Sequence, residues 1–143
     1  MKIDIPDSIN LNIPGRYILT VYVHPDKFSF SFHCPNDPES YFFCKINSTE
    51  QIDAFSTFKD LFFENDFFNY LFKKVCVLVF SPLFTYIPDK IYSDQYKEDF
   101  IKFIFSEKEE KFLDHSIPAV KAKVIFPVSE KINLIKSSLY LSE

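Results

Sequence analysis

The sequence has 143 residues, of which 47% are hydrophobic, and a net charge of −4. A chain this long and this apolar can bury a core without metal or disulfide cross-links, so we expect a folded domain rather than a disordered segment. The acidic balance argues against a general nucleic-acid or anionic-membrane binder, because both require a positive surface. The longest apolar run, residues 75–80, is too short to cross a bilayer, so we expect no membrane insertion.

The first half of the chain predicts an antiparallel meander of three strands. Residues 1–16 contain two prolines and the single glycine of the sequence, and we interpret them as an irregular lead-in. β-Branched and aromatic residues favour a strand over 17–23, and three phenylalanines alternate with polar residues over 28–33, which is the pattern of a strand with one buried face. After a turn-rich cluster, residues 41–46 complete the meander.

Helices and strands then alternate. Ser48 and Gln51 match a capping box, which predicts a helix over about 49–63. The continuously apolar run at 75–80 is typical of a central strand buried on both faces. A short extended piece at 84–87 is expected before the next helix.

The last third of the chain ends in a strand and a helix. A helix is predicted to start at Ser93, and the charged residues 106–116 are expected to form an exposed loop. A final strand is predicted over 120–126, stopped by Pro127, and a terminal helix is predicted to be capped by Ser129. The resulting order, βββαβαβα, calls for a mixed sheet with helices on its faces.

This order resembles the ribonuclease H-like unit shared by actin, sugar kinases and heat-shock ATPases. The segments LTVYVHPDKFSFSF, VCVLVFSPLFTYIPDKIYS and AVKAKVIFPVSEKINLI resemble an uncharacterised bacterial family with an actin-like ATPase fold, distantly similar to pilus-assembly actin homologues. The resemblance implies an α/β fold with a mixed five-stranded sheet of order 3-2-1-4-5 and helices on both faces. Residues 17–143 would form a single lobe, whereas members of the family carry two.

The turn between the first two strands argues against phosphate binding. In actin-like ATPases this turn begins with an aspartate and contains glycines that let backbone amides approach the phosphates. Here it reads Tyr-Val-His-Pro-Asp-Lys, residues 22–27, with no glycine and with a proline that lacks an amide donor. A hairpin turn is the simpler interpretation. The alternative is that Asp26 and Lys27 act as metal and phosphate ligands.

No catalytic residues, metal or cofactor are predicted. The expected first strand has no carboxylate for a two-metal nuclease. The three histidines, His24, His33 and His115, have no serine or cysteine at a spacing that would predict a nucleophile and its base. His33, Cys34 and Cys44 could approach zinc across a hairpin, but a fourth ligand is missing and adjacent residues point to opposite faces. An odd number of cysteines without a CxxC pair favours free thiols and a cytoplasmic location.

The one positive functional signal is the number of phenylalanines, 19 in a short chain. In each of the three Phe-Phe doublets the two side chains point in different directions, which predicts that some rings lie exposed in an interface. The candidates are Phe42, Phe63, Phe67 and Phe68. We therefore expect a non-catalytic module that binds protein: a second lobe, a copy of itself or an assembly partner. The alternative is a degenerate actin-like ATP-binding protein. No small-molecule substrate is evident.

Overall fold

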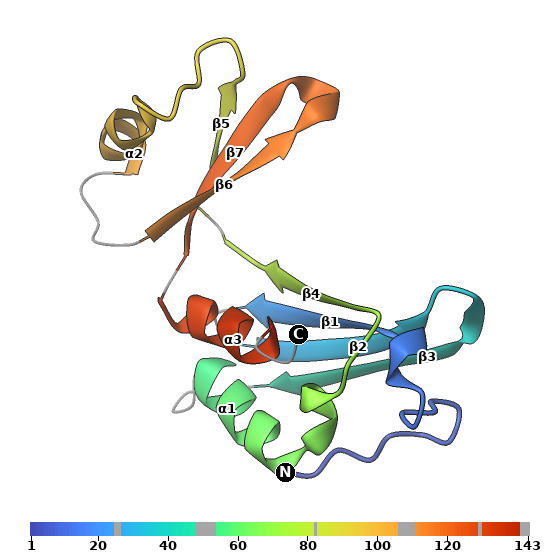
Figure 1. The fold of residues 1–143 in the computed structure, drawn as a ribbon. Helices are drawn as coiled ribbons and strands as arrows, with labels where there is room; N and C mark the ends of the chain where they lie inside the picture. The colour runs from blue at the N-terminus through green and yellow to red at the C-terminus, as the bar shows by residue number, and fades with distance from the viewer. Residues whose placement is uncertain (25–26, 48–53, 82, 106–110, 129, 141–143) are drawn as a thin grey trace. The chain divides into compact units, whose positions relative to one another are not determined.

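The computed structural model describes residues 1–24, 27–47, 54–81, 83–105, 111–128 and 130–140. The chain divides into two compact units (Figure 1). Unit 1 comprises Met1–Phe80 and Lys131–Glu143, and unit 2 comprises Ser81–Glu130. That residues 17–143 act as a single lobe stays a prediction.

Unit 1 is built on a mixed four-stranded sheet of order β3-β2-β1-β4 (Figure 1). Its strands are β1 (Ile18–His24), β2 (Lys27–Cys34), β3 (Asp37–Asn47) and β4 (Lys74–Val79). The first three strands pair antiparallel, as the meander predicts, and β4 pairs parallel to β1. The parallel pairing is possible because the helical segment between β3 and β4 carries the chain back to the start of the sheet.

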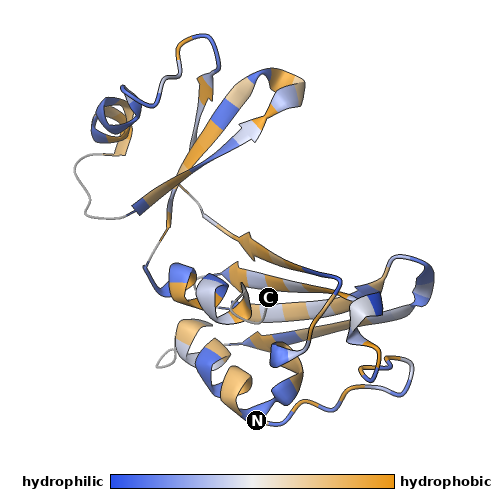
Figure 2. Cartoon of the chain, viewed as in Figure 1, coloured by the Kyte–Doolittle hydropathy of each residue, from blue (hydrophilic) through white to orange (hydrophobic). Residues whose placement is uncertain are grey.

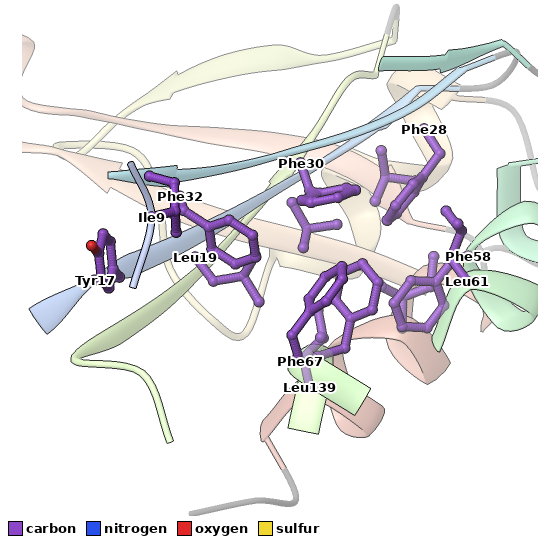
Figure 3. Close-up of a cluster of buried hydrophobic side chains, with 14 of the residues drawn as sticks. Ile9, Tyr17, Leu19, Phe28, Phe30, Phe32, Phe58, Leu61, Phe67 and Leu139 are labelled. Atoms are coloured by element: carbon purple, nitrogen blue, oxygen red, sulfur yellow. The ribbon is translucent and has the colours of Figure 1, made fainter. Parts of the chain in front are cut away.

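One face of this sheet forms the core of unit 1. The register places apolar side chains opposite one another in three rows from β3 to β4: Phe42, Phe32, Leu19 and Val75; Cys44, Phe30, Val21 and Val77; Ile46, Phe28, Val23 and Val79. The three phenylalanines of β2 are completely buried, so the period-2 pattern of this strand is confirmed. Figure 3 shows their rings directed toward the helical layer.

Helical segments cover this core face. Helix α1 (Ala54–Glu64) contributes Phe58 and Leu61, the 3-10 turn η2 (Asp66–Asn69) contributes Phe67 and Phe68, and α3 (Glu130–Tyr140) contributes Ile135 and Leu139. Among the described residues of unit 1 all helices pack on this face, which differs from the expected helices on both faces. The predicted caps at Ser48 and Ser129 lie outside the described residues.

The N-terminal lead-in packs on the same core rather than hanging free. Ile9 is 6% exposed, and a 3-10 turn, η1 (Pro14–Arg16), leads into β1. The buried Asn65 ties the lead-in to the end of α1: its Oδ1 accepts a hydrogen bond from the Ile3 amide at 2.9 Å, and its Nδ2 donates to the carbonyls of Met1 and Leu61, both at 3.0 Å. One asparagine therefore satisfies groups from both segments.

The predicted five-strand order 3-2-1-4-5 is wrong in its last strand. Within the described residues, β4 is the edge of a four-stranded sheet, and the final predicted strand belongs to a separate sheet in unit 2. Residues 75–80 were expected to be buried on both faces, yet Leu78 is 52% exposed and Phe80 is 57% exposed. A continuous apolar run does not distinguish a central strand from an edge strand whose second face is uncovered.

Unit 2 contains a three-stranded antiparallel sheet of order β5-β7-β6, formed by β5 (Thr85–Pro88), β6 (Lys111–Ile117) and β7 (Ala122–Val128). The helix α2 (Lys97–Phe105) precedes β6, and a 3-10 turn, η3 (Pro118–Val120), follows it. The predicted exposed loop over 106–116 is wrong from Lys111 onward, because β6 has mostly polar residues and lacks a strong strand signal. Strand β7 continues through Pro127, which lies beyond the end of β5 and so needs no amide for that neighbour.

Candidate functional site

The carboxyl ends of β1 and β4 are the natural place to look for a ligand site in unit 1. The two strands run parallel, so both end at the same edge of the sheet. In α/β folds, ligands bind outside the carboxyl ends of parallel strands. The Phe80 amide continues the pairing past β4 by donating to the Val23 carbonyl at 2.9 Å.

A shallow hollow of about 320 Å³ lies at this edge, lined by Tyr22, Val23, His24, Leu78, Val79 and Phe80. The ring centroids of His24 and Phe80 lie 4.6 Å apart, and the two rings are tilted by 32° to each other. Aromatic and aliphatic groups dominate the lining, and no acidic or glycine residue is among them. Such a hollow suits an apolar group better than a phosphate.

The residues proposed as nucleotide ligands are only partly placed. Asp26 lies outside the described residues, and Lys27 is exposed as the first residue of β2, opposite His24 on one side and Asn47 on the other. The single glycine, Gly15, precedes β1 and therefore lies at the opposite end of that strand. Ligand roles for Asp26 and Lys27 stay predictions.

The second face of the four-stranded sheet, which we call the open face, adjoins the hollow. Its side chains also form rows across β3, β2, β1 and β4: Tyr41, His33, Ile18 and Lys74; Phe43, Ser31, Thr20 and Cys76; Lys45, Ser29, Tyr22 and Leu78. No helix among the described residues of unit 1 packs its core residues against this face. Figure 2 shows β4, at its edge, as an almost continuous hydrophobic strand.

Some side chains of the open face are buried by their neighbours on the same face. Ser31 is only 2% exposed and Ser29 is 8% exposed, although both lie on this face. The rings of Tyr22 and Phe43 explain this burial, because they meet edge to face at 6.0 Å from strands on either side of β2 and so lie over its serines. Small residues therefore lie at the centre of this face beside larger rings, of which Phe43 remains 46% exposed.

The predicted interface phenylalanines separate into three groups. Phe63, on α1, is 74% exposed. Phe42 is half-buried and stacks on Phe32 at 6.2 Å. Phe67 and Phe68 are 7% and 1% exposed, so they belong to the core and not to a surface. They are buried because the 3-10 turn η2 directs both rings against the phenylalanines of β2.

The sequence interpretation missed four exposed apolar residues that lie in β3, in β4 and directly after β4. Tyr41, Phe43, Leu78 and Phe80 are between 46% and 57% exposed. The alternation of β3 offered a signal, because Tyr41 and Phe43 share a strand face with the charged Lys45 whereas Phe42 does not.

Comparison with known proteins gives the family of this chain and a solved structure with a similar fold. Residues 6–142 match the model of the protein family of unknown function DUF3822. The chain belongs to this family. A crystal structure from Bacteroides thetaiotaomicron VPI-5482, of a protein with actin-like ATPase fold and unknown function, is similar over 93% of the chain, with a TM-score of 0.81 and 22% identity. No curated protein matches the sequence.

The structural match confirms the expected actin-like ATPase fold and the resemblance to an uncharacterised family. At this identity it establishes the fold alone. The chain covers 52% of the Bacteroides protein, and so spans about half the length of that relative.

In the part of the chain that the structure describes, no three His, Cys, Asp or Glu side chains gather closely enough to hold a metal ion. Cys34 and Cys44 lie on the core side of the sheet, while His33 lies on the open face. Burial raises the pKa of the Cys44 thiol, which keeps it protonated and weakly nucleophilic. No described helix is long and apolar enough to span a membrane.

Unit 2 contains a polar cluster that anchors α2 to its sheet. Nζ of Lys97, on α2, lies 2.6 Å from Oδ2 of Asp114, on β6, and Nζ of Lys123, on β7, lies 4.4 Å from the centre of the Tyr92 ring. The Tyr92 hydroxyl shares its proton between Asp114 at 3.1 Å and Asp94 at 3.2 Å. Burial and these carboxylates raise the pKa of Tyr92 to about 12, and the bond from Lys97 lowers the pKa of Asp114. Every charge has a partner, so the cluster has a structural explanation.

Proposed function

We propose that this protein is a non-catalytic module with an actin-like fold that works by binding another protein through the open face and the adjoining hollow. The observation that carries the proposal is the apolar lining at the carboxyl ends of β1 and β4. Ligands of this fold class bind at that edge, and the residues there offer rings and aliphatic groups in place of phosphate-binding amides.

The chemistry of the open face fits a protein partner. Tyr41, Phe43, Leu78 and Phe80 expose about half of each side chain within unit 1. Exposed aromatic side chains on a rigid sheet lose little entropy when they are covered, and aromatic residues are enriched in the centres of protein interfaces. A folded sheet that fixes these rings in advance therefore favours protein binding over small-molecule chemistry.

A nucleotide titration tests the proposal against its main competitor, a degenerate ATP-binding protein. Calorimetry of the whole chain with ATP and Mg²⁺ should give no saturable heat, because the turn at 22–27 lacks glycine and contains Pro25. Saturable heat that disappears in the variant Asp26→Asn or Lys27→Ala would instead establish nucleotide binding, and the proposed function would then be wrong.

A dye titration tests the surface itself. A fluorescent apolar dye should bind the native chain, and Phe43→Ser on the open face should reduce its binding. Phe63→Ser is the matched control, because Phe63 is more exposed, at 74%, but lies on α1 outside the open face. Equal loss in both variants, or no binding to the native chain, would count against the open face as a docking surface.

A further inference from the structure

The N-terminal lead-in lies against the core of unit 1 without joining its sheet. Residues 1–13, which we call the strap, contain no helix or strand, and their burial follows a pattern: the side chains at positions 3, 5, 9 and 11 are buried or half-buried, and the others are exposed. These four residues are aliphatic, and they belong to the core cluster of unit 1 or pack against it. Figure 3 shows Ile9 at the same end of the cluster as Tyr17.

Side chains of unit 1, and not a ladder of backbone bonds, tie the strap backbone to the rest of the unit. Among the described residues, the hydrogen bonds of the strap to other backbone groups stay within residues 1–16. Three side chains make the long-range bonds to it: Asn65 near its start, Ser40 at the Ser8 carbonyl (3.2 Å) and Tyr17 at the Asn10 amide (3.0 Å). A segment with so few backbone bonds to its surroundings opens at a lower free-energy cost than a strand of the sheet.

Gly15 lies between the strap and β1, and the folded conformation does not require a glycine there. Its φ is not in the left-handed region, and a Cβ at this position would meet no described atom within 4 Å. It is nevertheless the single glycine among 143 residues. A residue with wide backbone freedom between a weakly tied segment and a strand is suited to be a hinge.

We propose that the strap opens as a unit about Gly15 and uncovers an apolar site that binds a segment of another protein with the same spacing of aliphatic side chains. The strap itself shows which chemistry this strap site accepts: four inward aliphatic residues, and backbone groups within reach of Asn65 and Tyr17. The strap site belongs to the core side of the sheet, so it is distinct from the open face.

A second copy of this chain is a weaker candidate for the strap site. Its strap is identical to the resident one, and a short tether gives the resident strap an effective concentration of about millimolar or more. An identical segment from a second copy therefore competes poorly at ordinary protein concentrations. A segment of a different protein displaces the strap when it binds the site more tightly, so the strap sets the affinity that a partner must exceed.

Hydrogen exchange of the whole chain tests the opening. The amides of Ile3, Ile9 and Asn10, which are all hydrogen-bonded, should exchange together and at least about tenfold faster than the amides of β2. Gly15→Ala should slow their exchange by about two- to fivefold, because alanine fits the closed conformation and restricts the open one. Exchange of the strap and β2 at one rate, or no effect of Gly15→Ala, would overturn the hinge.

A fluorescent peptide with the sequence of residues 1–13 tests the strap site, with its anisotropy measured against the whole chain. Ile9→Ser in the chain loosens the resident strap and leaves the site intact, so the peptide should bind this variant at least about tenfold more tightly than the native chain. Combining Ile9→Ser with Asn65→Ala in the chain removes an anchor of the site and should weaken peptide binding by about tenfold. Circular dichroism verifies that the variants fold.

The matched control is the same peptide carrying Ile9→Ser, which should bind the Ile9→Ser chain at least about tenfold more weakly than the native peptide does. Equal binding of the native peptide to the native and Ile9→Ser chains, or equal binding of the two peptides, would overturn the strap site. Light scattering distinguishes the occupants. A native chain whose mass doubles as its concentration rises, and which Ile9→Ser returns to one copy, would assign the site to a second copy and overturn its assignment to another protein.

Discussion

Substitution of the buried Phe30 is the most demanding test of how the core of unit 1 is stabilised. Phe30 is completely buried in the middle row of the core face, and five other phenylalanine rings lie between 5.2 and 6.4 Å from its ring. Its partners come from β2, β3 and η2, so the substitution Phe30→Ala removes a ring at which three elements meet.

The expected loss of stability in Phe30→Ala has two parts: the favourable burial of the ring is lost, and a cavity is left in its place. Phe-to-Ala changes in cores cost about 3–5 kcal/mol, and the cost is largest where the surroundings cannot collapse. Here the neighbours are anchored on separate elements, so we expect a loss of about 4–5 kcal/mol in the free energy of unfolding. That corresponds to a fall of about 8–20 °C in Tm for a chain of this size.

Far-UV circular dichroism during urea and thermal unfolding is the suitable assay, because the sequence contains no tryptophan. The control is Phe63→Ala, in which the same ring is removed from a position that is 74% exposed, and the expected change is within about 0.5 kcal/mol. The reasoning is refuted if Phe30→Ala loses less than about 1.5 kcal/mol, or if the two variants lose equal stability.

Three further predictions concern polar groups. Asn65→Ala should lower the free energy of unfolding by about 1–3 kcal/mol, because the Ile3 amide loses its acceptor. Limited proteolysis should then cut residues 1–12 faster than in the native chain. An unchanged rate of cleavage would argue against Asn65 as the anchor of the lead-in. The absorbance of the native chain at alkaline pH, compared with that of Tyr92→Phe, should show one tyrosine titrating near 12. The contribution of Tyr92 to the free energy of unfolding should be complete below the ordinary tyrosine pKa of 10 and should decrease above it. Asp114→Asn should destabilise unit 2 at neutral pH, and the difference from the native chain should shrink as the pH falls below 3.8, since the folded pKa of Asp114 is lowered; a pH-independent difference would contradict this.

The sequence predicted the meander of unit 1 well because its pattern is local. Phe28, Phe30 and Phe32 alternate with polar residues, and a strand with one buried face produces that alternation wherever it lies in a sheet. The same holds for α3, whose Ile135 and Leu139 are spaced for one face of a helix and are both buried.

Other features could not be predicted because they depend on partners distant in the sequence. The buried Asn65 gives no sequence signal, since its partners include Met1 and Ile3. Strand β6 exists because β7 pairs with it, and its own residues have weak strand propensity. The Phe67-Phe68 doublet looked suited to a surface, whereas the turn η2 buries both rings.

The sequence by itself determined which segments form the helices and strands of the core, and it determined that the first turn lacks the glycine needed to surround a phosphate, because both properties depend on neighbouring residues alone. Only the tertiary structure decided that β4 is the last strand of the sheet among the described residues, and that the described helices of unit 1 cover one face of that sheet. It alone also decided that the rings of Tyr22 and Phe43, which lie opposite Ser29 and Ser31, meet across β2. Apolar residues in a strand require burial, but the sequence does not specify which surface supplies it.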